Sequence, residues 1–110
     1  MKTYSISSLY RGIQLTLMVL AKSNADAARI ADVSAYHMRQ YSGVVKGRHP
    51  MLPADAEDES AYAYFDSGEL MYAMPDNRRT LFPYSQMKEI IDAHRKECPT
   101  YQATLEKYLP

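Results

Sequence analysis

The side chains that could bind a metal ion are few and widely spaced. His94 and Cys98 lie four residues apart on an expected helix, a spacing that supplies two of the four ligands of a structural zinc site. His37 and His49 each stand alone, so no second pair of ligands lies close by in the sequence. We therefore expect no metal site, and we interpret His94 as part of the core-facing side of its helix.

The sequence also lacks the patterns that usually accompany catalysis. It contains no phosphate-binding loop, no dinucleotide fingerprint, no nucleophile elbow and no zinc-protease motif. Asp55, Glu57, Asp58 and Glu59 form an acidic cluster, but their spacing differs from that of a calcium-binding EF-hand loop. We expect a protein without enzymatic activity and without a cofactor. The alternative, an enzyme or small-molecule binder, would have a deep pocket with perturbed titratable groups.

The composition is that of one small domain with balanced charge. The chain has 110 residues, 46% of them hydrophobic, which suits a single domain over residues 1–110. Thirteen Lys/Arg balance thirteen Asp/Glu, so bulk charge does not draw the chain to nucleic acid or to membranes. The first fifty residues hold seven Lys/Arg and two Asp, whereas the remainder holds six Lys/Arg and eleven Asp/Glu. This distribution predicts a basic end and an acidic end.

Two features favour a cytoplasmic location. Cys98 is the only cysteine, which excludes an internal disulfide and fits a reducing compartment. The apolar stretch Ile13–Ala21 is interrupted by Gln14 and Thr16 and is too short to span a bilayer. We interpret that stretch as a buried strand and expect no contact with a membrane.

Hydrophobic periodicity predicts an α+β fold. Apolar residues alternate on both sides of Arg11-Gly12, a pattern typical of a β-hairpin, and the second strand is apolar on both faces, as in the centre of a sheet. Ser23 and Ser34 are helix-capping residues, and prolines interrupt the segment that carries the acidic cluster. We expect a small antiparallel sheet of two hairpins, packed by a short αα-hairpin and C-terminal helices. The expected units are a hairpin (2–21), an αα unit (23–42), an exposed acidic loop (44–60), a hairpin and edge strand (61–84) and helices (85–109).

The strongest local signal lies in residues 24–41, NADAARIADVSAYHMRQY. Ala28 permits a close helix crossing, Asp32 falls at the turn and Ser34 caps the next helix. The form AARIADVSAYHMRQY resembles the helix-turn-helix at the start of MerR-like regulators. The resemblance implies DNA binding, with the hairpin at 61–74 as a wing; the alternative is an αα-hairpin that only covers the sheet. The second helix would present to the major groove Ala35, Tyr36, His37, Arg39 and Gln40.

A longer run, LTLMVLAKSNADAARIADVSAYHMRQYSG, resembles small accessory proteins of phages and other mobile elements. In such proteins a strand leads through AKS into a capped Ala-rich helix. They are often anti-defence factors, including anti-CRISPR proteins that occupy the surface of a defence complex. The resemblance implies a stoichiometric inhibitor that has no cofactor and acts in the cytoplasm of a host bacterial cell.

We therefore predict that the chain binds another macromolecule. The expected partner is a larger protein or nucleoprotein complex of a bacterial defence system; DNA is the alternative, and a homodimer is compatible with the sequence. Tyrosine, present ten times, is favoured at recognition surfaces, and the acidic cluster could compete with phosphate for a nucleic-acid-binding groove. The candidate partner-binding residues are Tyr36, His37, Arg39, Gln40, Tyr62, Tyr64, Tyr72, Asp55, Glu57, Asp58 and Glu59.

Overall fold

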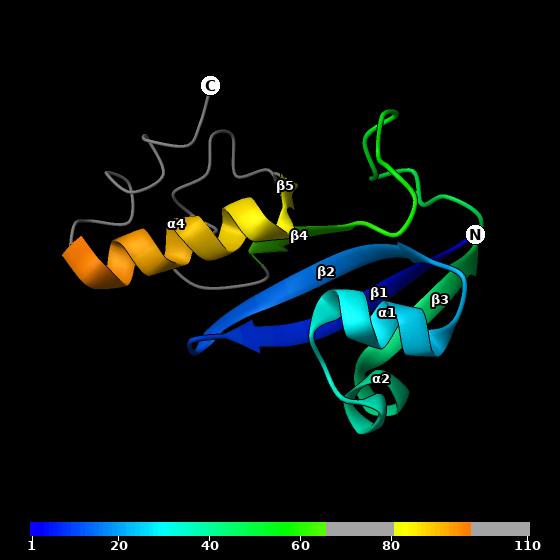
Figure 1. Cartoon of the computed structure of the whole chain (residues 1–110), viewed down its shortest axis with the longest axis horizontal. Helices are drawn as coiled ribbons and strands as arrows, with labels where there is room; N and C mark the ends of the chain where they lie inside the picture. Colours follow the sequence, from blue (N-terminus) through cyan, green and yellow to red (C-terminus); the bar gives the residue numbers. More distant parts are fainter. Residues whose placement is uncertain (66–80, 98–110) are drawn as a thin grey trace.

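The computed structural model describes residues 1–65 and 81–97, with side chains described as far as residue 93. Within these residues, a five-stranded antiparallel sheet with the strand order β3-β1-β2-β4-β5 is combined with three helices (Figure 1). The expected α+β class is confirmed. The elements are β1 (Lys2–Tyr10), β2 (Ile13–Ala21), α1 (Asn24–Ala31), α2 (Ala35–Tyr41), β3 (Ser42–Lys46), β4 (Ala61–Phe65), β5 (Phe82–Pro83) and α4 (Tyr84–Glu97).

The N-terminal hairpin forms where its alternation predicts it. Arg11 and Gly12 connect β1 to β2 with φ angles of 50° and 83°, and such paired positive values are typical of the two-residue turns that match strand twist. β2 lies between β1 and β4, and every residue from Leu15 to Ala21 is buried. The central position expected from its apolar character is confirmed.

One face of the sheet carries the main core, and all three helices pack on it. Alternate residues of β1 and β2, including Tyr4, Ile6 and Leu17, meet the small side chains of α1 and the apolar side of α4. Burying a large apolar side chain stabilises a fold by roughly 1.5–3 kcal/mol, so this layer holds the molecule together. The helical contributors are Ala27, Ala28, Ala31, Met38, Tyr84, Met87, Ile90 and Ile91.

Serine caps position the two short helices, as the sequence predicts. The Ser23 hydroxyl accepts a hydrogen bond from the Asp26 N–H at 3.2 Å, and the Ser34 hydroxyl accepts one from the His37 N–H at 3.1 Å. Asp32 ends α1 in the left-handed conformation, with a φ of 59°. This residue turns the chain so that α2 begins only four residues after α1 ends.

The segment expected as an exposed loop over 44–60 is different in two respects. Its first residues belong to β3, which pairs with β1 so that Val44 lies opposite Tyr4. The remainder folds against the second face of the sheet, where Leu52 and Ala56 are buried beside Met18. These two apolar residues are isolated in the sequence, and only the long-range contact with the sheet gives them a core.

Hydrogen bonds hold this segment at the start of β1. The Thr3 hydroxyl donates to the Gly47 carbonyl at 2.6 Å and accepts from the His49 N–H at 3.1 Å. The Arg48 guanidinium donates to the Ala56 carbonyl across the loop. Residues 47–60 therefore pack on the sheet through Leu52 and Ala56, while the acidic residues of the segment are exposed, as expected.

The C-terminal expectations are only partly within the described residues. β4 pairs with β2 on one side and β5 on the other, so it lies inside the sheet and is not part of a projecting wing. An edge strand and a helix occur where they were expected, as β5 and α4. The expected return strand with Tyr72, the side chain of His94, Cys98 and the last helix lie outside the described residues or side chains.

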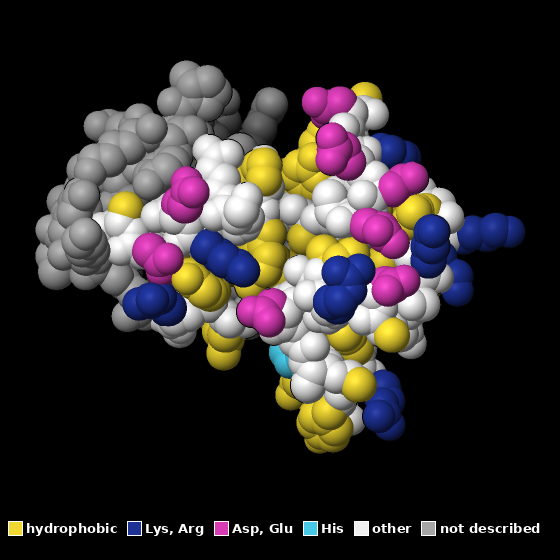
Figure 2. Space-filling model, viewed as in Figure 1, with side chains coloured by type: hydrophobic (Ala, Val, Ile, Leu, Met, Phe, Trp, Pro, Cys, Tyr) yellow, Lys and Arg dark blue, Asp and Glu magenta, His cyan; other side chains and the backbone are white. Residues whose placement is uncertain are grey.

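The charge asymmetry of the sequence does not produce two separate ends on the face in view. Figure 2 shows acidic and basic side chains interspersed there, because the packed segment brings its acidic residues back to the part of the molecule that holds the N-terminus (Figures 1 and 2). In the portion of the chain that the structure describes, no helix has the length and apolar character needed to cross a bilayer.

Candidate interaction surface

The helix α2 has one buried side and one exposed side. Met38 is 3% exposed and enters the main core, whereas Tyr36 is 68% exposed. Arg39 and Gln40 are exposed as well. Three of the four expected contact residues on this helix are therefore open to solvent.

His37, the fourth, has a structural contact. Its Nε2 atom lies 2.5 Å from the carbonyl oxygen of Ser7 in β1, and because a carbonyl only accepts, this nitrogen must carry the proton. Its ring also lies 4.8 Å from that of Tyr41, tilted by 39°. His37 thus ties α2 to the sheet and orients Tyr41, and it has less freedom to contact a partner.

The exposed apolar character of α2 continues into β3. Tyr41 is 56% exposed, Val44 55% and Val45 45%. Together with Tyr36 they make up four of the seven large exposed hydrophobic side chains of the described residues, within ten consecutive positions. We define the α2–β3 surface as the side chains of Tyr36, Arg39, Gln40, Tyr41, Val44, Val45 and Lys46.

This surface is basic. Between Val33 and Ala54 the sequence has no Asp or Glu, but it has Arg39, Lys46 and Arg48. Both ion pairs found in the described part of the chain lie elsewhere and involve Arg11 and Arg29. The cations next to the exposed valines and tyrosines therefore have no acidic neighbour in the local sequence.

A hollow of about 560 Å³ adjoins the α2–β3 surface. It lies between the end of β1 and the start of α2, with Leu9, Val33, His37 and Tyr41 among its lining residues. Its volume is within the range of sites that accept a small molecule or a buried anchor side chain. Leu9, 67% exposed, adds an apolar side chain to a lining that also contains the polar residues Gln14 and Asp32.

The acidic cluster lies on a different surface, next to the start of α4. Asp55, Glu57 and Glu59 line a second hollow of about 560 Å³ with Tyr62 and Lys88, and Asp58 is exposed outside it. The structure therefore brings Tyr62 to the acidic residues rather than to Tyr36. Tyr64 is 6% exposed and belongs to the core of the second face, which leaves little of its surface for a partner.

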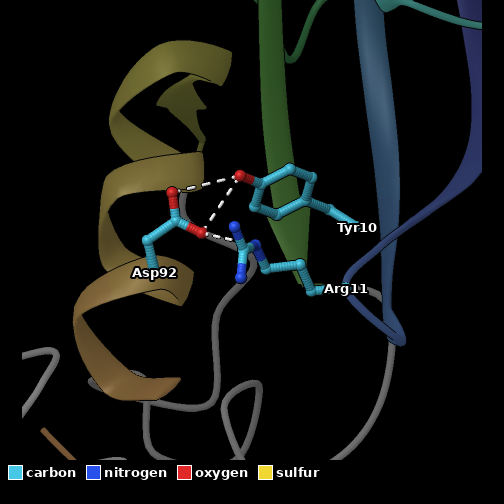
Figure 3. A network of polar contacts seen from close by, with 3 residues as sticks. All are labelled: Tyr10, Arg11 and Asp92. Carbon is cyan, nitrogen blue, oxygen red and sulfur yellow. Dashed lines mark hydrogen bonds and ion pairs between the residues drawn. The ribbon is translucent and has the colours of Figure 1, made fainter. Parts of the chain in front are cut away.

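A polar network joins the tip of the first hairpin to α4. The Tyr10 hydroxyl donates to the Asp92 carboxylate at 3.0 and 3.1 Å, and Arg11 Nε lies 2.8 Å from the same group (Figure 3). The hydrogen bond with Tyr10 and the Asp92 charge raise the pKa of Arg11. Neither hollow includes these three residues, so we interpret the network as a tie between two elements.

Tyr84, at the first position of α4, has a perturbed titration. Burial raises its pKa, and the negative charges of Asp32 and of ionised Tyr10 raise it further. The Lys88 ammonium lies 4.2 Å from the centre of the Tyr84 ring, a cation–π arrangement. A neutral, buried phenol of this kind serves as a core residue with a polar edge.

Sequence reasoning missed Tyr41, Val44, Val45 and Lys46. The available signal was the pair of β-branched valines directly after a helix end, since such residues favour strands.

No group of three or more His, Cys, Asp or Glu in the described ranges is arranged to hold a metal ion. Comparisons of the chain with protein families, with curated proteins and with solved structures found no match.

Proposed function

We propose that this protein acts by binding another macromolecule through the α2–β3 surface. The observation that supports the proposal best is the concentration of exposed Tyr and Val side chains, with cations beside them, on one helix and the adjoining edge strand. Val44 and Val45 lie on opposite faces of β3, so the exposed apolar side chains flank the strand on both sides. Exposed apolar side chains that gather in one part of a small domain often mark a binding site. Tyr and Arg are also the residue types that dominate the energy of protein interfaces.

The arrangement suits a preorganised contact. α2 is fixed by the Ser34 cap, the buried Met38 and the bond from His37 to β1, so Tyr36 is presented from a rigid element. Little entropy is then lost on binding, which favours affinity. The hollow beside Tyr41 is large enough to take an anchor side chain of the partner.

The partner class we propose is a larger protein or nucleoprotein complex of a bacterial defence system, bound as by a stoichiometric inhibitor. The basis for this class is the resemblance of residues 15–43 to phage accessory proteins. The second surface, with Asp55, Glu57 and Glu59 around a hollow, could oppose a phosphate-binding groove of such a complex.

The test uses affinity capture from bacterial lysate with the tagged full chain, followed by identification of the retained complex and measurement of its dissociation constant. Tyr36→Ser and Arg39→Gln should each weaken binding about tenfold or more, the loss expected for a residue that anchors an interface. Arg29→Gln is the matched control, because Arg29 is an exposed helical arginine outside the α2–β3 surface. Equal affinities for all variants, each with unchanged thermal stability, would refute the proposal.

DNA binding by α2 is the second candidate, favoured by a capped helix that exposes Arg39 and Gln40 after a turn at Asp32. Both residue types can read base edges. If this function holds, a gel shift with duplex DNA should weaken steeply as salt rises, because phosphate contacts release counterions. Absence of a shift at low ionic strength would refute it.

A further inference from the structure

The directions of the main-chain groups in β3 follow from two contacts and from the pairing of β3 with β1. The Ser7 carbonyl in β1 points toward His37, which lies on the β3 side of β1. Main-chain groups alternate in direction along a strand, so those of Thr3 and Ser5 also point toward β3. Gly47, at the end of β3, donates its N–H to the Met1 carbonyl at 3.2 Å, so odd-numbered residues of this segment face β1. Ser42, Val44 and Lys46 must therefore point their N–H and C=O groups away from the sheet.

In the described part of the chain, β3 is also an open edge. It is the outermost of the strands that the structure describes on its side of the sheet. Figure 1 shows β3 beside β1 at the end of the molecule that holds the N-terminus, with α2 leading into it. Such an edge offers a row of donors and acceptors to any extended chain that approaches it.

The side chains around this edge indicate which kind of molecule could bind there: a second copy of β3, a nucleic acid or an acidic polypeptide. Lys46 lies opposite Lys2 of β1, and Arg39 lies on the helix that leads into the strand. A second copy of β3 would bring further cations to the same edge, and edge lysines are a common device against self-pairing. Nucleic acid would use the cations but would bury Val44 and Val45 against phosphate and sugar. An acidic polypeptide strand uses both the charges and the valines.

One face of β3 is open around Gly43. A side chain placed on Gly43 would meet no atom within 4 Å, so the packing of this chain does not require glycine there. Val45, on the same face of β3, is 45% exposed. The face therefore has space and apolar surface together, which an incoming strand could cover.

We propose that β3 accepts an extended acidic segment of the partner protein as an additional strand, bonded to the main chain of Ser42, Val44 and Lys46. This inference rests on the proposed binding function and specifies how the partner is recognised. Lys2, Val44 and Lys46 lie on the face of the sheet that carries the helices, and Val45 lies on the other face. Acidic side chains of the segment pair with Lys2, Lys46 and Arg39 on the first face, while its apolar side chains cover Val45 on the second. Main-chain bonds supply affinity, and the charges select the sequence.

The probe is a synthetic peptide of about ten residues in which valine and glutamate alternate, added to the full-length protein. Amide hydrogen exchange is followed at single residues by NMR. The Val44 and Lys46 amides should exchange rapidly in the free protein and slow roughly tenfold or more with peptide, since a new hydrogen bond protects them. The Gly43 and Val45 amides, bonded to β1, should stay protected throughout.

Two comparisons, one between variants of the protein and one between peptides, test whether main-chain hydrogen bonds and charge cause the binding. Val44→Pro removes the outward N–H but not a bond to β1, and proline is tolerated on such edges; Val44→Thr keeps both the N–H and the branched side chain. The proline variant should lose peptide binding, whereas the threonine variant should keep it. Independently of any variant, methylation of the central amides of the peptide, or replacement of its glutamates by lysines, should abolish binding.

Other outcomes overturn the proposal. These are no binding of the acidic peptide, equal binding of the lysine or methylated peptides, or slowing of the Val44 amide only by duplex DNA. Slowing that grows with protein concentration without peptide would instead assign the edge to a second copy. If capture of the partner from lysate is lost in Tyr36→Ser but unchanged in Val44→Pro, the binding function stands and strand addition fails.

Discussion

On α2, neighbouring side chains differ in burial: some enter the core and others are exposed to solvent. Met38 enters the core while Tyr36 and Arg39 remain in solvent, because the helix lies on β1 with only one side against the sheet. Periodicity could predict this division for Met38. It could not show that His37 would bond the Ser7 carbonyl, because that contact joins residues thirty positions apart.

Tyr84 allows a prediction about pH. Its pKa in the folded state is raised above the unfolded value of about 10, mainly by burial. The folded state therefore holds the phenol proton more tightly, and this stabilisation is present below about pH 10 and is lost as pH rises through the folded pKa. In Tyr84→Phe that loss should be absent, so the free energy of unfolding should fall less steeply above pH 10 than in the wild type. Urea denaturation from neutral to alkaline pH measures it, and parallel curves would contradict the assignment.

At the scale of elements, the sequence predicts the turns, caps and helix ends that depend on interactions between near neighbours in the chain. The hairpin turn at Arg11-Gly12, the serine caps and the end of α2 at Tyr41 are all set by residues within a few positions of one another. β3 and the packed segment after it were missed because their partners, β1 and β2, lie far away in the sequence. Leu52 and Ala56 have no periodic neighbours that would mark them as core residues.

The packed segment gives a prediction of stability. Leu52 is 8% exposed against the second face of the sheet, so Leu52→Ala should lower the free energy of unfolding by about 2 kcal/mol or more through lost burial and a residual cavity. The adjacent Met51 is 38% exposed, and Met51→Ala is the matched control, with an expected change of about 0.5 kcal/mol or less. Urea denaturation compares the two. Equal small effects would mean that residues 47–60 add nothing to the stability of the sheet.

At the scale of the whole molecule, the candidate site was predicted only in part. The sequence drew attention to Tyr36, Arg39 and Gln40, and the structure exposes all three. It separates them from Tyr62 and the acidic residues, which lie around the second hollow. The predicted separation into a basic and an acidic end fails on the face in Figure 2, because a linear charge count ignores how the chain returns on itself.

Two surfaces of different charge therefore lie on one small scaffold. The α2–β3 surface offers apolar side chains, cations and an open strand edge, whereas the second hollow offers carboxylates around Tyr62. Simultaneous use of both would let a small domain span a larger area of its partner. The first carries the proposed function because it alone combines exposed aromatic residues with a rigid helix.

Site-specific photo-crosslinking in bacterial cells tests the central proposal most directly. p-Benzoylphenylalanine is placed in turn at Tyr36 and Val44, within the α2–β3 surface, and at Arg29 and Glu89, which are exposed outside it. Binding through the α2–β3 surface predicts one discrete covalent adduct of the same partner from positions 36 and 44, and none from 29 and 89. Adducts that form equally at all four positions, or only at 29 and 89, would contradict it.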